Sequence, residues 1–205
     1  MTNSLFGVFL VLIIFSVLVL GALGFGAHLY TISEMTGGVY GSRLNTYADF
    51  NLGLSVRYPS DFVVNERYYY SGMGLDNQIQ GVSFSVPESK LKGTNLLQGT
   101  KASVEVIPNM PTCNVRLFLS DPTNIRSFLE DDVLYSSALK KTNDRHNEYE
   151  ELVYAITGSS PCVAIRYLIK TAPVTSYNAA SVSLYNRKDL LSAFDTMRRS
   201  LVVQK

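Results

Sequence analysis

The sequence is poor in the residues on which catalytic and metal sites are usually built. Its 205 residues include two Cys, two His and no Trp. Neither Cys has another Cys or a His at metal-ligand spacing, which argues against a zinc site. No Gly-x-Gly-x-x-Gly or P-loop pattern occurs, and Gly158-Ser159-Ser160 differs from the Gly-x-Ser-x-Gly nucleophile elbow. The sequence therefore carries no catalytic signature, and we expect no cofactor.

The sequence also lacks an excess of charge of either sign. Its formal net charge is +1, and Lys and Arg are scattered apart from short pairs such as Lys140-Lys141 and Arg198-Arg199. We interpret these pairs as solvated surface charge. A near-neutral domain has no electrostatic reason to bind nucleic acid, so nucleic acid is not an expected partner.

One long segment contains no charged residue. Between Leu5 and Ala27 the chain consists mainly of Leu, Val, Ile and Phe. A helix over this run would be about 34 Å long, enough to span a hydrocarbon core of about 30 Å. We expect residues 1–30 to form a single transmembrane anchor with the lipid bilayer as its partner. The alternative is a cleaved secretory signal, although this run exceeds the usual apolar core of such signals and no Lys or Arg precedes it.

Both cysteines lie beyond this segment. Cys113 and Cys162 form an even pair, which predicts one disulfide in an oxidising compartment. The soluble domain would then lie outside the cytoplasm, in a periplasmic or extracellular position. The alternative is a pair of buried thiols in a cytosol-facing domain. Loop charges near the anchor are too few to settle its orientation.

A glycine-rich linker over residues 31–46 precedes the soluble domain, which we place at 47–205. In the first part of this domain, apolar and polar residues alternate with the period of a strand. The predicted strands are Leu52–Tyr58, Phe62–Tyr70, Val82–Val86 and Ala102–Val106. We expect the second of these strands to pair with the first across the turn at Pro59-Ser60-Asp61.

A short helix is predicted next, over Pro122–Asp131. Asp121 can cap it, and Ile125, Phe128 and Leu129 recur at i, i+3, i+4 spacing. Three further strands follow, at Val133–Lys140, Glu148–Ile156 and Cys162–Ile169.

The last of these strands is apolar on both faces except for Arg166, so we expect it to be central and Arg166 to need a buried partner. The chain closes on an amphipathic helix whose apolar side carries Leu190, Phe194 and Met197, with Asn186 as its cap. Together these elements predict an α+β domain: a mostly antiparallel sheet with a short middle helix and a C-terminal helix packed on it.

The two ends of this domain resemble PsbP-like domains. Leu54-Ser55-Val56-Arg57-Tyr58-Pro59-Ser60-Asp61-Phe62 is similar to the opening strand of that family, and residues 193–201 are similar to its last helix. The resemblance covers about twenty residues and extends to small bacterial single-pass membrane proteins. The resemblance implies an α/β/α-like sandwich around an antiparallel sheet. It also implies an accessory or binding role, because the best-known member is an extrinsic subunit of photosystem II. It carries over no functional residue.

Two groups of residues are candidate sites. Asp144, His146, Glu148 and Glu150 recur at every second position, so an extended segment would place all four on one face, where they could hold a hard cation. The alternative is a charged edge strand that resists aggregation. Three consecutive tyrosines form the second group: Tyr68 and Tyr70 would share one face and Tyr69 the other, as core side chains or as a binding platform.

We expect an anchored, extracytoplasmic accessory or binding module with a protein partner in the cell envelope. One alternative is an envelope enzyme, such as a metal-assisted hydrolase that uses the Asp144–Glu150 face. Another is a small subunit of a membrane complex, assembled through small residues near Gly21–Ala27.

Overall fold

The computed structural model describes residues 40, 43–74, 76–144, 146–173 and 182–204. The chain divides into two units, Met1–Gly38 and Val39–Lys205, and the second unit holds the whole described fold. The expected membrane segment Leu5–Ala27 lies outside the described residues. Within these ranges, no helix is long and apolar enough to cross a membrane.

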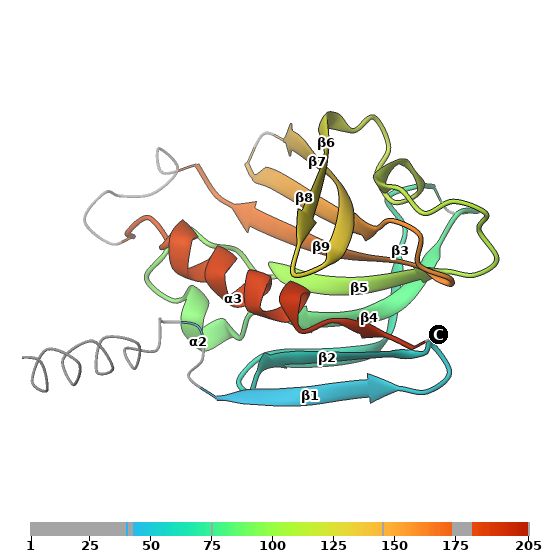
Figure 1. Ribbon diagram of the computed structural model, residues 1–205. Helices are drawn as coiled ribbons and strands as arrows, with labels where there is room; N and C mark the ends of the chain where they lie inside the picture. Colours follow the sequence, from blue (N-terminus) through green and yellow to red (C-terminus); the bar gives the residue numbers. More distant parts are fainter. Residues whose placement is uncertain (1–39, 41–42, 75, 145, 174–181, 205) are drawn as a thin grey trace, which may run out of the picture. The chain divides into compact units, whose positions relative to one another are not determined.

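Most strands belong to one large antiparallel sheet (Figure 1). Its order is β3-β4-β5-β9-β8-β7-β6, so β9 is central, as its two-sided apolar pattern predicts. The strands are β3 (Val63–Tyr70), β4 (Ile79–Ser85), β5 (Lys101–Ile107), β6 (Thr123–Glu130), β7 (Val133–Asn143), β8 (Glu148–Ile156) and β9 (Cys162–Thr171).

A second, small sheet joins the beginning and the end of the described chain. β2 (Leu54–Pro59) pairs antiparallel with β1 (Leu44–Asp49) on one side and with β10 (Val202–Val203) on the other. β1 begins at Leu44, inside the segment 31–46 that the sequence predicts as linker.

The C-terminal helix α3 (Arg187–Arg199) confirms its prediction, including its start. The Asn186 side chain accepts a hydrogen bond from the backbone N–H of Asp189, so it occupies one of the donors that a helix start leaves unpaired. Two shorter helices are α2 (Glu88–Leu91) and the 3-10 turn η1 (Val115–Leu117). The α+β class, with a mostly antiparallel sheet and a C-terminal helix, is therefore confirmed.

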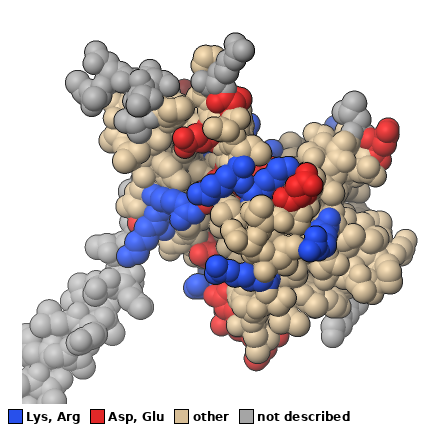
Figure 2. Space-filling model, turned by 90° about the horizontal axis from the view of Figure 1, so that it is seen from above, with Lys and Arg blue, Asp and Glu red and all other residues tan. Residues whose placement is uncertain are grey.

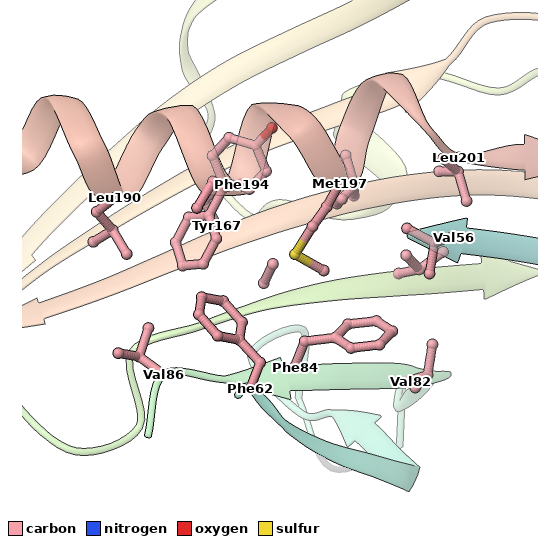
Figure 3. Packing of buried hydrophobic residues seen from close by; sticks show 14 of the residues in the cluster. Val56, Phe62, Val82, Phe84, Val86, Tyr167, Leu190, Phe194, Met197 and Leu201 are labelled. Atoms are coloured by element: carbon pink, nitrogen blue, oxygen red, sulfur yellow. The ribbon is translucent and has the colours of Figure 1, made fainter. Parts of the chain in front are cut away.

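The main hydrophobic core lies between α3, the small sheet and one face of the large sheet. Figure 3 shows Phe194 and Met197 of α3 directed toward Phe62, Phe84 and Tyr167. The Phe194 ring lies 5.1 Å from the ring of Tyr167 and 6.1 Å from that of Phe62, centroid to centroid. Large rings in such arrangements bury much apolar area, which holds the helix against the sheet.

The predicted middle helix is wrong, because residues 123–130 form strand β6. β6 pairs with β7 across a turn in which Asp131 and Asp132 both have positive φ, 48° and 62°. This is the backbone of the two-residue hairpin turns that match strand twist, and Asp tolerates it. Ile125 and Leu129, two of the three apolar residues at helical spacing, are 38% and 67% exposed, so the spacing does not mark a buried helical face.

Two smaller predictions also need correction. The strand at Phe62–Tyr70 does not pair with its predecessor, because β2 belongs to the small sheet and β3 pairs with β4. Arg198 is not solvated but 4% exposed. It lies one helical turn from Phe194 on the packed side of α3, where its guanidinium pairs with Glu130 of β6 and lies over the ring of Tyr154.

The predicted disulfide is confirmed. Cys113 and Cys162 are joined, with their Cα atoms 5.1 Å apart. The bond fixes the segment 108–122 to the start of β9, and around it a second core forms on the other face of the large sheet. Its buried members include Val115, Phe118 and Val153.

Loss of this disulfide is expected to destabilise the fold strongly. The two cysteines are 49 residues apart, and a closed loop of that length lowers the free energy of the folded state relative to the unfolded chain by about 4 kcal/mol in the chain-entropy model. We expect the double variant Cys113→Ser/Cys162→Ser to lose that amount in urea unfolding. An unchanged unfolding midpoint would show that the segment 108–122 stays in place without the bond.

Candidate functional site

The face of the large sheet that points away from α3 carries an unusual number of charged side chains for a packed surface. We call it the charged face. The charged residues that β5, β7, β8 and β9 direct to it are Lys101, Glu105, Lys140, Glu151, Arg166 and Lys170. The pleat alternates side chains between the two faces, so these six share one side, while the residues between them enter the main core.

Arg166 is the centre of the charged face. Its side chain is fully buried. Its Nε donates to Glu105 Oε1 and one terminal nitrogen to Glu105 Oε2, each at 2.8 Å. The other terminal nitrogen pairs with Glu151, and the Phe118 carbonyl accepts a further hydrogen bond. The sequence-based expectation that Arg166 needs a buried partner is therefore confirmed.

Two of the three consecutive tyrosines lie on this cluster. The Tyr70 ring covers the Arg166 guanidinium at 3.4 Å, and its hydroxyl donates to Glu151 Oε2 at 2.9 Å. Tyr68 is buried beside Glu105, and the Lys101 ammonium lies 4.3 Å from its ring centroid. Burial raises the pKa of both phenols, so both stay protonated at neutral pH. The prediction that Tyr68 and Tyr70 share a face is confirmed.

This cluster is a closed network rather than a reactive centre. Both carboxylates accept hydrogen bonds from Arg166, and a buried polar network whose members all have hydrogen-bond partners rigidifies a fold. What the sequence misses is the identity of the partners. Glu105 is a charged residue between two Val residues, and Arg166 is a charged residue between Ile165 and Tyr167. A buried charge needs a partner, so this shared pattern is the signal that could have predicted their pairing.

Tyr69 points away from the cluster and lines a groove. It is 54% exposed. The groove has a volume of about 890 Å³ and lies at the end of the sandwich where the β1–β2 turn, the start of β4, the end of β5 and the segment 108–122 meet. Its lining mixes apolar residues with side-chain amides: Leu52, Met73, Val106, Pro108, Leu117 and Pro161 with Asn51, Asn77, Gln78 and Gln80.

The four candidate metal ligands are not brought together. β8 begins at Glu148, so Asp144 and His146 belong to the turn before it rather than to one extended strand. The Asp144 carboxylate accepts hydrogen bonds from the backbone N–H groups of His146 and Asn147 and from the Tyr149 hydroxyl. His146 itself is exposed.

Glu150 is engaged elsewhere. Its carboxylate pairs with Lys141 of the adjacent strand and with Arg187 at the start of α3. Among the residues that the structure describes, no group of three or more His, Cys, Asp or Glu side chains is placed to hold a metal ion.

Solved structures with a similar chain course have low sequence identity to this chain. The solution structure of cyanobacterial PsbP from Synechocystis sp. PCC 6803 matches with a TM-score of 0.44 and 14% identity, covering 82% of this chain and 96% of that one. A crystal structure from Bacteroides thetaiotaomicron VPI-5482 matches with a TM-score of 0.43 and 11% identity over 82% of this chain, which spans 50% of that protein. No protein-family model and no curated protein matches the sequence. A PsbP structure is thus among the structural neighbours of the chain.

We expect the Arg166 cluster to dominate the stability of the charged face. Arg166→Met leaves Glu105 and Glu151 without their cation, and breaking a buried pair costs about 3–5 kcal/mol. Urea unfolding followed by circular dichroism measures this loss. The double variant Arg166→Met/Glu105→Leu should recover part of it, because one uncompensated charge is removed.

Arg187→Met provides the matched control, because Arg187 also pairs with a glutamate of β8 but is 49% exposed. We expect a loss below about 1 kcal/mol there. Equal losses at Arg166 and Arg187 would contradict the central role of the buried cluster.

Asp144 gives a pH-dependent prediction. Hydrogen bonds, first from the backbone N–H of His146 and then from Tyr149, lower the pKa of Asp144 from 3.8 to about 2. Because the pKa is lower in the folded state, the ionised Asp144 carboxylate stabilises the fold above pH 3.8. This contribution is lost as the pH falls from 3.8 through about 2. Carboxyl NMR should show the depressed titration, and it should return toward 3.8 in Tyr149→Phe. Titration of the wild-type carboxyl at its ordinary value would show that the turn is not held this way.

Proposed function

We propose that this chain is a membrane-anchored, extracytoplasmic accessory module that binds an extended segment of a partner envelope protein. The observation that carries the proposal is the groove beside Tyr69. Its volume of about 890 Å³ lies at the upper end of ordinary ligand sites.

The chemistry of the groove suits a polypeptide backbone. Asn51, Asn77, Gln78 and Gln80 each offer a donor and an acceptor, as the peptide groups of an extended segment require. The charged lining residues are Asp76 and Arg116, one of each sign, so the groove does not select for a strongly charged ligand.

The apolar lining of the groove adds contact area, and a disulfide holds part of the groove wall in place. Tyr69 presents an exposed ring with a polar tip, a side chain enriched where partners bind. Pro161 lies next to Cys162, whose disulfide secures the neighbouring segment 108–122. Rigid walls reduce the entropy lost on binding, which supports a partner site rather than an incidental hollow.

Two features support the location. The uncharged run Leu5–Ala27 is long enough to anchor the chain in a bilayer. The disulfide between Cys113 and Cys162 is the kind of bond that persists in oxidising compartments and is rare in the cytosol. An anchor followed by an oxidised domain supports an envelope position outside the cytoplasm.

A site-specific cross-linking experiment in cells tests this proposal. A photo-reactive amino acid is placed at Tyr69 in the full-length chain and, as a control, at Val63, which lies on the same strand and is 60% exposed. We expect one dominant protein adduct from position 69 and none of that mass from position 63. The thiols of Cys113 and Cys162 should be oxidised in the same cells.

A blocking variant makes the test specific to the groove. Gln80 is an exposed lining residue, so Gln80→Trp fills the groove with little risk to the fold. The adduct from position 69 should disappear in this variant while its expression and circular dichroism stay unchanged. A persistent adduct, or identical adducts from positions 63 and 69, would overturn the groove as the binding site.

A further inference from the structure

The charged face contains more cations than its buried cluster uses. Of the six charged side chains defined above, four are positive and two are negative. Arg166 occupies both carboxylates, because it pairs with Glu105 and with Glu151. The whole chain has a formal net charge of only +1, so this excess of two positive charges is a local concentration rather than a general property. The view from above in Figure 2 shows that elsewhere on the surface Lys and Arg side chains lie close to Asp and Glu side chains.

Three of the four cations on the charged face form no ion pair among the described residues, and one of the three, Lys140, donates a hydrogen bond to the Ser120 hydroxyl. Among the described residues, neither Lys101 nor Lys170 forms an ion pair. They lie on adjacent strands, and Leu168, the cross-strand neighbour of Lys101, is two residues from Lys170. Both side chains therefore reach the same part of the charged face, at the end of β5 opposite to the groove.

Each of the two ammonium groups lies near an aromatic ring. The Lys101 ammonium lies 4.3 Å from the Tyr68 ring centroid, and that of Lys170 lies 5.6 Å from the Tyr149 ring centroid. Such contacts favour a cation over a ring face. Gly99, with φ of +89°, leaves room for Lys170, because a Cβ there would lie only 3.0 Å from Lys170 Nζ.

The two ammonium groups also repel each other. Burial lowers the pKa of Lys101, the positive charge of Lys170 lowers it further, and the nearby Glu105 carboxylate offsets only part of this shift. An anion bound between them would relieve this repulsion, so the arrangement favours a ligand that adds negative charge.

We propose that Lys101 and Lys170 form a binding site for a phosphate dianion, either free or carried by a lipid headgroup. A dianion matches the two surplus positive charges of the face, and lysine ammonium groups bind phosphate as point charges. The site is separate from the groove, since the two lie at opposite ends of β5. An experiment that rejects the phosphate site therefore leaves the proposal for the groove standing, and the reverse also holds.

Titration of the full chain with inorganic phosphate, in neutral detergent at constant ionic strength, tests the site. We expect saturable binding by calorimetry, weakened at least tenfold in Lys101→Met/Lys170→Met, because each lost charge-assisted contact is worth about that factor. The control Lys92→Met/Lys188→Met removes the same charge from two exposed lysines and should bind as the wild type does. Absence of saturable binding, or equal weakening in both double variants, would overturn the proposal.

A chemical readout checks the residues directly. Because its pKa is lowered, Lys101 should react with an amine-specific acylating reagent faster than exposed lysines do, and phosphate should slow that reaction at Lys101 and Lys170 but not at Lys92. Reaction rates at Lys101 that phosphate does not change would contradict the assignment.

Vesicles distinguish the two sources of the phosphate group. Vesicles with phosphatidic acid, compared with vesicles of phosphatidylcholine alone, should protect Lys101 and Lys170 if the ligand is a lipid headgroup. Protection by inorganic phosphate alone would assign a soluble ligand to the same site. Protection by neither would reject the site.

Discussion

The burial of one guanidinium constrains much of the described fold. Arg166 lies on the central strand β9 with no exposed side-chain surface. A buried charge without partners is too costly to persist, so its neighbours must be supplied from distant parts of the sequence. Glu105 comes from β5, Glu151 from β8, the ring of Tyr70 from β3 and a carbonyl from Phe118. The register of four strands and the path of the segment 108–122 must all satisfy this one group.

This constraint gives the two faces of the large sheet different characters. The face toward α3 is a conventional apolar core, in which side chains from the helix and from both sheets interdigitate. The opposite face is held by an ion cluster and a disulfide, with a smaller apolar core between them. Lys101 and Lys170 lie together at one end of β5, and the groove forms at the other end, where turns from both sheets meet.

Strands were predicted well where local pattern and tertiary environment agree. β5, β7, β8 and β9 contain the predicted segments, and β4 contains all of its predicted segment except Val86, because alternation or a two-sided apolar run directly reflects burial in a sheet. The sequence predicts a helix at β6 because exposed apolar residues, Ile125 and Leu129, fall at helical spacing from Phe128, and because Asp131-Asp132 is not a common hairpin signal. The pairing of β2 was also missed, since two strands joined by a short turn can enter different sheets.

The sequence by itself determined the α+β class, the C-terminal helix with its Asn186 cap, the pairing of the two cysteines and the need of Arg166 for a partner. Each of these depends on local periodicity, on chain-neighbour hydrogen bonds or on the count of one residue type. Only the tertiary structure decided that Glu105 and Glu151 are those partners, that Tyr69 lines a groove and that Asp144 and Glu150 point to separate contacts. Strand register sets these relations, and register depends on long-range pairing and on the satisfaction of buried charge, which no short window of sequence contains.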